Sequence, residues 1–246
     1  MHGAGSAFES VSGGKMTRSR RSAVLQNGDP QSPDGHGLNG SDGPATGHAA
    51  VPKGNAYAKY ASTSVIERRF MAKFFTRLNQ ALPTVAPLRV LEVGIGEGEV
   101  AERVAQRFPN ATVIGLDLPD AVLAQEWRTR DITAVFGDIT RLPFPDRAFD
   151  LVMAIEVLEH VPHPDRALAE LTRVAARDVV VSVPREPLWR IANMARGKYW
   201  NDLGNTPGHI QHWSSRGFRR FVARHLEVTA HHSPTPWTML AARVRS

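Results

Sequence analysis

Three glycines and several acids crowd one short stretch of the chain, E-V-G-I-G-E-G-E from Glu92 to Glu99. The β-branched run before it favours a buried parallel strand, and the apolar residues after it recur at helical spacing. Gly94, Gly96 and Gly98 leave the backbone of the intervening turn open to close approach by a ligand. The pattern therefore predicts a binding loop between a strand and a helix.

The acids of this loop argue against a dinucleotide. A dinucleotide fingerprint places its third glycine three residues after the second, and here that position is Glu99. Glu97 adds a further acid, and acids repel a pyrophosphate but suit a ligand that carries an ammonium and a sulfonium. At this point the sequence resembles the class I methyltransferases that use S-adenosyl-L-methionine (SAM), in particular the branch of ubiquinone and menaquinone biosynthesis enzymes. The resemblance implies SAM as the cofactor and a small-molecule acceptor as the partner.

Further acids stand where later strands are expected to end. Asp117 lies about twenty residues beyond the glycine loop, where a carboxylate can accept hydrogen bonds from both ribose hydroxyls of an adenosine; it can also cap the following helix. The resemblance implies that Asp138 binds the adenine amino group, with Ile139 beside the ring. The predicted cofactor-binding residues are Glu92, Gly94, Ile95, Gly96, Gly98, Asp117, Leu118, Asp138, Ile139 and Glu156.

A segment similar to one in the family, L-P-F-P-D-R-A-F-D, leads into the fourth strand and then into E-V-L-E-H, which carries Glu156, Glu159 and His160. Three interpretations remain open for this group. The side chains can bond neighbouring backbone, His160 can act as a general base near neutral pH, or the two carboxylates and the imidazole can hold Mg, Mn or Zn. Because the segment also resembles that of methyltransferases that use no metal, we predict no metal site.

Two further histidines, His209 and His212, lie in N-T-P-G-H-I-Q-H-W-S. A Gly-x-His element in this order is similar to one in quinone-pathway O-methyltransferases. Either histidine can deprotonate an acceptor hydroxyl or hold the loop in shape, and a metal would need a third ligand nearby. The candidate catalytic residues are therefore His160, His209 and His212.

The most individual part of the chain is the segment 185–213, which we expect to form a cap and to set acceptor specificity. Its first part, 185–200, mixes apolar and aromatic residues with arginines and a lysine. It can be a lid over the acceptor, an interfacial helix in peripheral contact with a membrane, or a helix packed on the domain edge.

Strand and helix patterns alternate along the remaining chain. They predict an α/β, Rossmann-like domain with a seven-stranded sheet, parallel except for one antiparallel strand in a C-terminal hairpin, and helices on both faces. We expect this domain over 54–246 and a disordered Gly/Ser/Pro-rich tail over 1–53. Expected strands after the first are 111–118, 132–139, 149–156, 178–184, 226–231 and 237–244. Within 55–82 we expect an amphipathic helix preceded by a shorter one, and further helices over 163–176 and from Ser214.

Composition narrows the classes of function. The 246 residues contain no cysteine, which excludes disulfides, thiolate nucleophiles and zinc-thiolate sites. No run has the length of a transmembrane helix and no signal-peptide core opens the chain, so we expect a cytoplasmic protein. The net charge of +6 keeps a nucleic-acid methyltransferase as an alternative, but the basic residues are scattered. The other alternative is a SAM-fold protein with a regulatory or non-methyl-transfer role; the oligomeric state stays open.

Overall fold

The computed structural model describes residues 65–130, 132–195, 197 and 199–245. The tail predicted to be disordered and the start of the expected domain, 54–64, lie outside the described residues. In the described part no helix is long and apolar enough to cross a membrane.

Seven strands form one mixed sheet in the order β3-β2-β1-β4-β5-β7-β6. The strands from β1 to β5 pair in parallel, and β7 runs antiparallel to both of its neighbours. This confirms the predicted sheet, with its single antiparallel strand in a C-terminal hairpin. The strands are β1 (Arg89–Val93), β2 (Thr112–Asp117), β3 (Ala134–Phe136), β4 (Phe149–Ile155), β5 (Ala175–Pro184), β6 (Leu226–His232) and β7 (Trp237–Val244).

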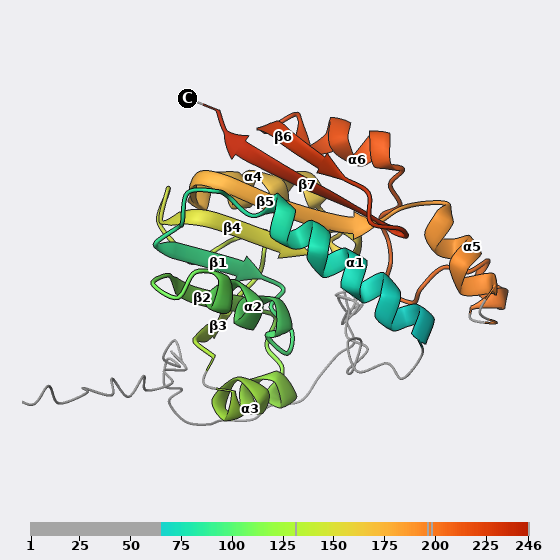
Figure 1. Ribbon diagram of the computed structural model, residues 1–246, viewed down its shortest axis with the longest axis horizontal. Coiled ribbons are helices and arrows are strands. Elements are labelled where there is room, and N and C mark those ends of the chain that lie inside the picture. The colour runs from blue at the N-terminus through green and yellow to red at the C-terminus, as the bar shows by residue number, and fades with distance from the viewer. Residues whose placement is uncertain (1–64, 131, 196, 198, 246) are drawn as a thin grey trace, which may run out of the picture.

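Helices lie on both faces of this sheet, with α1 and α2 on the near face and α4 behind it in Figure 1. They are α1 (Val65–Ala81), α2 (Glu99–Arg107), α3 (Ala121–Thr129), α4 (Pro164–Val174), α5 (Leu188–Ala195) and α6 (Ser215–Val222). Two short 3₁₀ turns, η1 (Leu158–His160) and η2 (Trp200–Asp202), complete the described elements.

The core divides into layers because successive residues of a strand point to opposite faces. On β4, Leu151 and Met153 pack with residues of α1 and α2. Val152 and Ala154, which alternate with them, pack with residues of α4 and α6 on the other face. The near-continuous apolar runs of the central strands thus follow from burial on both sides.

Several predicted boundaries differ from those in the structure, most clearly at β3, α4 and β5. Strand β3 is shorter than the expected 132–139 because the chain turns after Gly137, where the Asp138 carboxylate accepts the backbone N–H and the hydroxyl of Thr140 at 2.7 and 2.9 Å. Strand β5 begins at Ala175 rather than at 178, because Ala175 already pairs with Phe149, and α4 therefore ends at Val174 rather than at 176.

The sheet has a topological switch point at β1 and β4. The chain passes from β1 to β2 on one side, and β4 lies on the other side of β1. Ligands of open α/β sheets bind beyond the carboxyl ends of the strands at such a point. The glycine loop follows β1 and Glu156 follows β4, so both stand at this edge.

Candidate functional site

The loop after β1, residues 94–98, adopts backbone conformations that favour glycine. Gly94, Gly96 and Gly98 have φ angles of 73°, 53° and 88°, where a Cβ brings strain. A Cβ at Gly94 would also collide with the side chain of Val157. Gly98 is the N-cap of α2, so the loop delivers the chain directly into a helix N-terminus.

Two side chains from other elements hold this loop in place. The Asp117 carboxylate accepts the backbone N–H of Gly96 at 2.8 Å, and the indole N–H of Trp127 donates to the Gly96 carbonyl at 2.8 Å. Trp127 is fully buried on α3. Nothing in the sequence pointed to it, because an aromatic residue in an amphipathic helix predicts only core packing.

Two neighbouring acids carry raised pKa values at this point. Burial, and then the nearby charge of Asp117, raises the pKa of Glu92 well above its usual value; Glu92 is 2% exposed. Burial also raises the pKa of Asp117, opposed by its hydrogen bonds from the backbone of Gly96 and Leu118. One oxygen of Glu92, Oε2, is buried and has no hydrogen-bond partner among the described residues. A buried acid with an unsatisfied oxygen, next to a second, part-buried acid, fits a cationic ligand and does not fit a phosphate.

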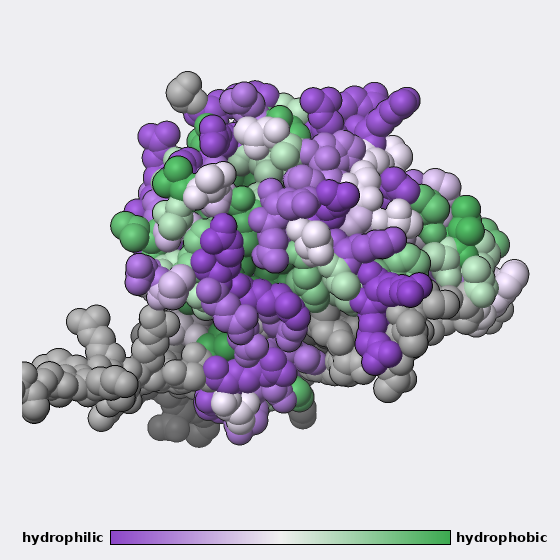
Figure 2. Space-filling view, viewed as in Figure 1, coloured by the Kyte–Doolittle hydropathy of each residue, from purple (hydrophilic) through white to green (hydrophobic). Residues whose placement is uncertain are grey.

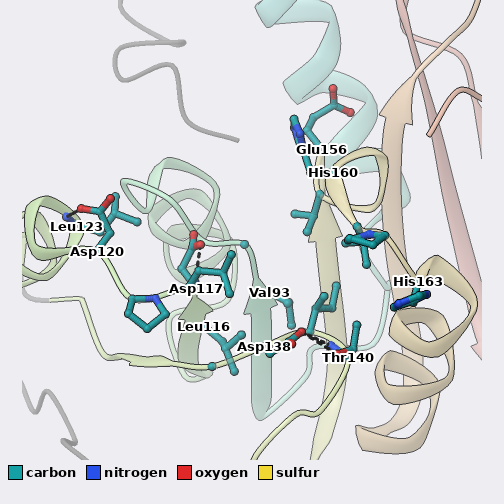
Figure 3. A pocket seen from close by; sticks show the side chains of 18 residues that line it. Val93, Leu116, Asp117, Asp120, Leu123, Asp138, Thr140, Glu156, His160 and His163 are labelled. Atoms are coloured by element: carbon teal, nitrogen blue, oxygen red, sulfur yellow. Dashed lines mark hydrogen bonds between the residues drawn. The ribbon is translucent and has the colours of Figure 1, made fainter. Parts of the chain in front are cut away.

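A cavity of about 370 Å³ lies at the carboxyl ends of the strands, of the size that holds a cofactor (Figure 3). Of the predicted residues, those that line it are Gly94, Asp117, Leu118, Asp138, Ile139, Glu156 and His160. Glu92, Ile95, Gly96 and Gly98 do not line it, and the Ile95 side chain packs into the core beside Trp127.

Several lining residues were missed by the sequence reasoning. They are Val93, Leu116, Pro119, Asp120, Leu123, Gly137, Thr140, Val157, Val161, Pro162 and His163. Most of them are next to a predicted site residue in the sequence, at the end of a strand. Their position in the sequence, rather than their residue type, could have identified them.

Glu156 stands at the end of β4 in an uncommon conformation. Its φ of 60° places a non-glycine residue in the left-handed region, which costs about 1–3 kcal/mol and is typical of functional positions. The hydroxyl of Ser182 on β5 donates to its carboxylate at 2.8 Å. The structure thus holds this carboxylate at the cavity wall.

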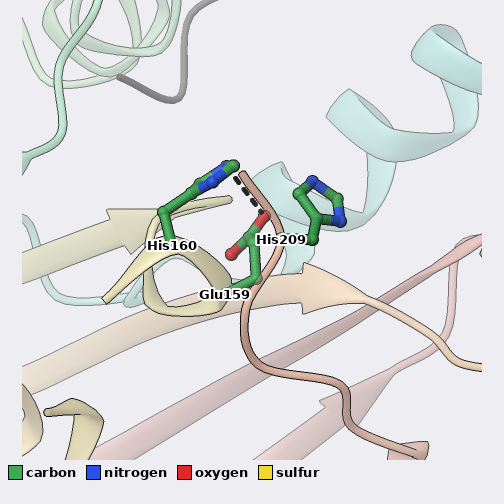
Figure 4. A group of neighbouring side chains, drawn as sticks. All are labelled: Glu159, His160 and His209. Carbon is green, nitrogen blue, oxygen red and sulfur yellow. Dashed lines mark ion pairs between the residues drawn. The ribbon is translucent and has the colours of Figure 1, made fainter. Parts of the chain in front are cut away.

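Beside the cavity, Glu159, His160 and His209 come together from segments about fifty residues apart in the sequence (Figure 4). One side-chain oxygen or nitrogen of each lies within 4.8 Å of the others. The rings of His160 and His209 meet edge to face, 4.8 Å between centroids. His212 is elsewhere: it is exposed, and its Nε2 lies 2.9 Å from the side-chain oxygen of Asn205.

The protonation pattern of neutral His160 follows from its contact with the loop. Its Nδ1 lies 2.9 Å from the carbonyl oxygen of Gly208. A carbonyl only accepts, so Nδ1 carries the proton and Nε2 keeps a lone pair. Nε2 is 4.0 Å from Oε1 of Glu159, so a proton taken up at Nε2 would face a carboxylate.

Residues of the segment 185–213 contact the group formed by Glu159, His160 and His209. Trp189 of α5 stacks on His209, with 5.9 Å between ring centroids, and its indole N–H donates to the Thr206 hydroxyl at 2.8 Å. The Glu159 carbonyl accepts the backbone N–H groups of Ile210 and Gln211 at 2.9 and 3.0 Å. The loop is therefore fastened to η1 on both sides of His209.

One carboxylate and two imidazoles are also a donor set that can hold a divalent metal with an open coordination position. The set that the sequence offered, Glu156, Glu159 and His160, lacked His209, which reaches the group only through the fold. The prediction of no metal site stays a prediction.

A family model described as a methyltransferase domain matches residues 91–183. The match runs from β1 to β5 and covers every strand of the switch point. Residues 91–183 thus match a class I, SAM-dependent methyltransferase domain. The predicted family, with its quinone-biosynthesis branch, is confirmed by this match together with the curated relatives.

Two relatives and one solved structure show the extent of the similarity. The malonyl-[acyl-carrier protein] O-methyltransferase of Geobacter sulfurreducens is 33% identical over 125 residues, 49% of this chain and 46% of the relative. The demethylmenaquinone methyltransferase of Thermus thermophilus is 36% identical over 110 residues, 42% of this chain and 50% of the relative. The domain thus spans about half the length of the curated relatives that it matches.

The magnesium protoporphyrin IX methyltransferase of Synechocystis, solved with bound S-adenosylhomocysteine (SAH), shares the methyltransferase fold with a TM-score of 0.55. Its sequence identity is 16%, and the superposition covers 75% of this chain and 89% of that chain. The family implies SAM as the cofactor, and the acid pair and cavity beside the glycine loop fit that cation.

Proposed function

We propose that the protein transfers a methyl group from SAM to a hydroxyl group of a small-molecule acceptor: an aromatic or quinol, a sugar or a lipid-like metabolite. The observation that carries the hydroxyl assignment is the geometry of His160. This residue lines the cofactor cavity and keeps a lone pair on Nε2. The O-methyltransferase activity named for the Geobacter relative supports the same chemistry.

In this proposal, the carboxyl ends of β1, β2 and β4 and the loop after β3 bind the cofactor. Asp117 has two carboxylate oxygens with lone pairs beyond those that accept the Gly96 and Leu118 N–H groups, and these suit ribose hydroxyls. Glu92 and Asp117 give the site the negative charge that a sulfonium and an ammonium need. When bound, SAM supplies a methyl group on a sulfonium that a nucleophile displaces.

Acceptor activation falls to His160. Nε2 takes the hydroxyl proton as the oxygen attacks, and the resulting imidazolium keeps its Nδ1–H bond to Gly208 and faces the Glu159 carboxylate. Displacement at a methyl group requires alignment of the attacking oxygen more than elaborate acid–base chemistry. The hydroxyl proton would end on His160 and the methyl group on oxygen, while the bond from sulfur to the methyl carbon would break and the cofactor would leave as the neutral thioether S-adenosylhomocysteine.

We also propose that 54–246 is one methyltransferase domain in which 185–213 caps the acceptor side. The hydrogen bonds between the Glu159 carbonyl and the 210–211 backbone support this role. A tail over 1–53 would then stand outside the catalytic domain.

The test is methyl transfer from SAM with an isotope-labelled methyl group. The purified full chain is incubated with phenols, quinols, sugars and hydroxylated lipids, and products are assigned by mass spectrometry and NMR. We expect a new methyl ether. A label found on carbon or nitrogen would contradict the hydroxyl assignment, and SAM binding without any transfer would favour a regulatory role.

A further inference from the structure

Large apolar side chains stand exposed on the segment that follows β5. They are Ile191, Tyr199, Trp200, Leu203 and Ile210, with exposed fractions of 54, 39, 63, 69 and 42%. Figure 2 shows hydrophobic residues gathered at the end of the molecule where α5 lies. In the described part of the chain, the other large hydrophobic residues with comparable exposure are Val85, Leu88, Leu118 and Val122.

Helix α5 and the turn 199–204 form one packed unit. The side-chain amide of the buried Asn193 donates to the Gly204 carbonyl at 2.9 Å, and Arg190 donates to the Asp202 carbonyl at 3.4 Å. The backbone of Gly204 approaches that of Arg190 so closely that a Cβ would collide with it. The exposed side chains of α5 and the turn are therefore carried by a defined structure.

Two of these residues are held in a conformation that bulky side chains avoid. Tyr199 and Leu203 have φ angles of 57° and 49°, at a cost of about 1–3 kcal/mol each. Both side chains are exposed, so core packing does not offset the cost. Strained, exposed apolar residues point to a surface that acts through contact with something else.

The net charge of the segment that carries these residues favours an anionic partner. The segment 185–213 contains four cations against two acids: Arg185, Arg190, Arg196 and Lys198 against Glu186 and Asp202. Trp and Tyr with neighbouring Arg and Lys are the residues that settle at the boundary between lipid tails and headgroups. A second copy of the chain would bring the same excess of cations to the contact.

We infer that Ile191, Tyr199, Trp200, Leu203 and Ile210, here called the apolar patch, dock the protein on an anionic lipid surface. Trp189, by contrast, faces His209. No described helix can span a bilayer, so the contact is peripheral. Because Ile210 also binds the Glu159 carbonyl through its N–H, docking brings the His160 side of the domain close to the lipid.

The experiment is flotation of the full chain with phosphatidylcholine vesicles, with and without phosphatidylglycerol. The wild type is compared with a Trp200→Ser/Leu203→Asn variant; asparagine tolerates the left-handed conformation of position 203. Leu88→Asn is the matched control, since Leu88 is 67% exposed just before β1, at the opposite end of the sheet. Thermal unfolding and calorimetric S-adenosylhomocysteine (SAH) binding report the folding of each variant separately from lipid binding.

We expect the wild type and Leu88→Asn to float with anionic vesicles. The double variant should bind these vesicles at least about tenfold more weakly, with its SAH binding unchanged. High salt lowers the anionic preference. Equal flotation of all three proteins, or none by the folded wild type, overturns the inference. A second result would also overturn the inference: the wild type forms a dimer in light scattering, the double variant is a monomer, and neither protein binds vesicles. A second copy of the chain would then cover the apolar patch. Methyl transfer is not required for any of these outcomes.

Discussion

The two sides of the site are built differently. On the cofactor side, the proposed binding residues lie at or just after the carboxyl ends of strands β1 to β4. Those that share a strand end are close together in the sequence. On the acceptor side, His160 depends on residues 189–211, which reach it only after the chain has completed β5. The family match ends at residue 183, where the individual segment begins. We therefore propose that the general function lies in the strand ends and that the segment 185–213 determines the choice of acceptor.

This difference suggests that the two sides can be damaged separately. Changes at the strand ends should alter SAM affinity, and changes around His160 should alter turnover with the cofactor still bound.

Asp117→Asn should have the largest effect. The substitution removes the charge of a carboxylate that holds the glycine loop and faces the cavity, so we expect SAM affinity to fall about a hundredfold. Calorimetry measures the loss. The control is Asp165→Asn, which breaks only an exposed ion pair with Arg224. Wild-type affinity in Asp117→Asn would show that the cofactor does not use this strand end.

His160→Gln should lower kcat about a hundredfold, because glutamine can still donate to Gly208 but cannot take a proton. The affinity for SAH should not change, and the pH–rate profile should lose its acidic limb. His212→Gln serves as the control, since this histidine is exposed and bonded to Asn205. A greater loss with His212→Gln than with His160→Gln would reverse the assignment.

Trp189→Phe should act only on the acceptor side. It removes the hydrogen bond to Thr206 and weakens the stack on His209, so we expect kcat to fall about three- to tenfold and stability by about 1 kcal/mol. SAH calorimetry should match the wild type. If cofactor affinity fell together with kcat, the two sides would not be separate.

The pH should affect the cofactor side in a defined direction. Burial raises the pKa values of Glu92 and Asp117, so the folded protein without SAM disfavours the charged form of both acids relative to the unfolded chain. The contribution of these two acids to the free energy of unfolding is fully present below their pKa values in the unfolded chain, near 4. It is lost as the pH rises through their higher pKa values in the folded protein. A bound cation offsets that loss. We expect the rise in Tm on adding SAM to grow with pH, and to grow less in Glu92→Gln.

Metal removal should have the smallest effect. We expect EDTA to leave SAH affinity and turnover unchanged, in line with the prediction of no metal site. Loss of turnover that Zn²⁺ or Mg²⁺ restores, and that disappears in His209→Gln, would instead assign Glu159, His160 and His209 as metal ligands.

The sequence was informative where the chemistry is local. The spacing of three glycines predicted the loop, the acid about twenty residues beyond it predicted Asp117, and the resemblance to the family predicted Asp138; both acids line the cavity. Trp127 could not be predicted, because its bond to Gly96 joins residues 31 positions apart. The same limit applied to His209, whose partners Glu159 and His160 lie on another loop. It also applied to Trp189, which the pattern left free to face lipid but which the fold turns toward His209.

The most direct test of the two-sided site is calorimetric SAH binding to the wild type, Asp117→Asn and His160→Gln, with turnover measured on the same samples. We expect the wild type and His160→Gln to bind equally well and Asp117→Asn to bind weakly, whereas turnover falls in both variants. No binding by the wild type, or equal loss of binding in the two variants, would contradict the account.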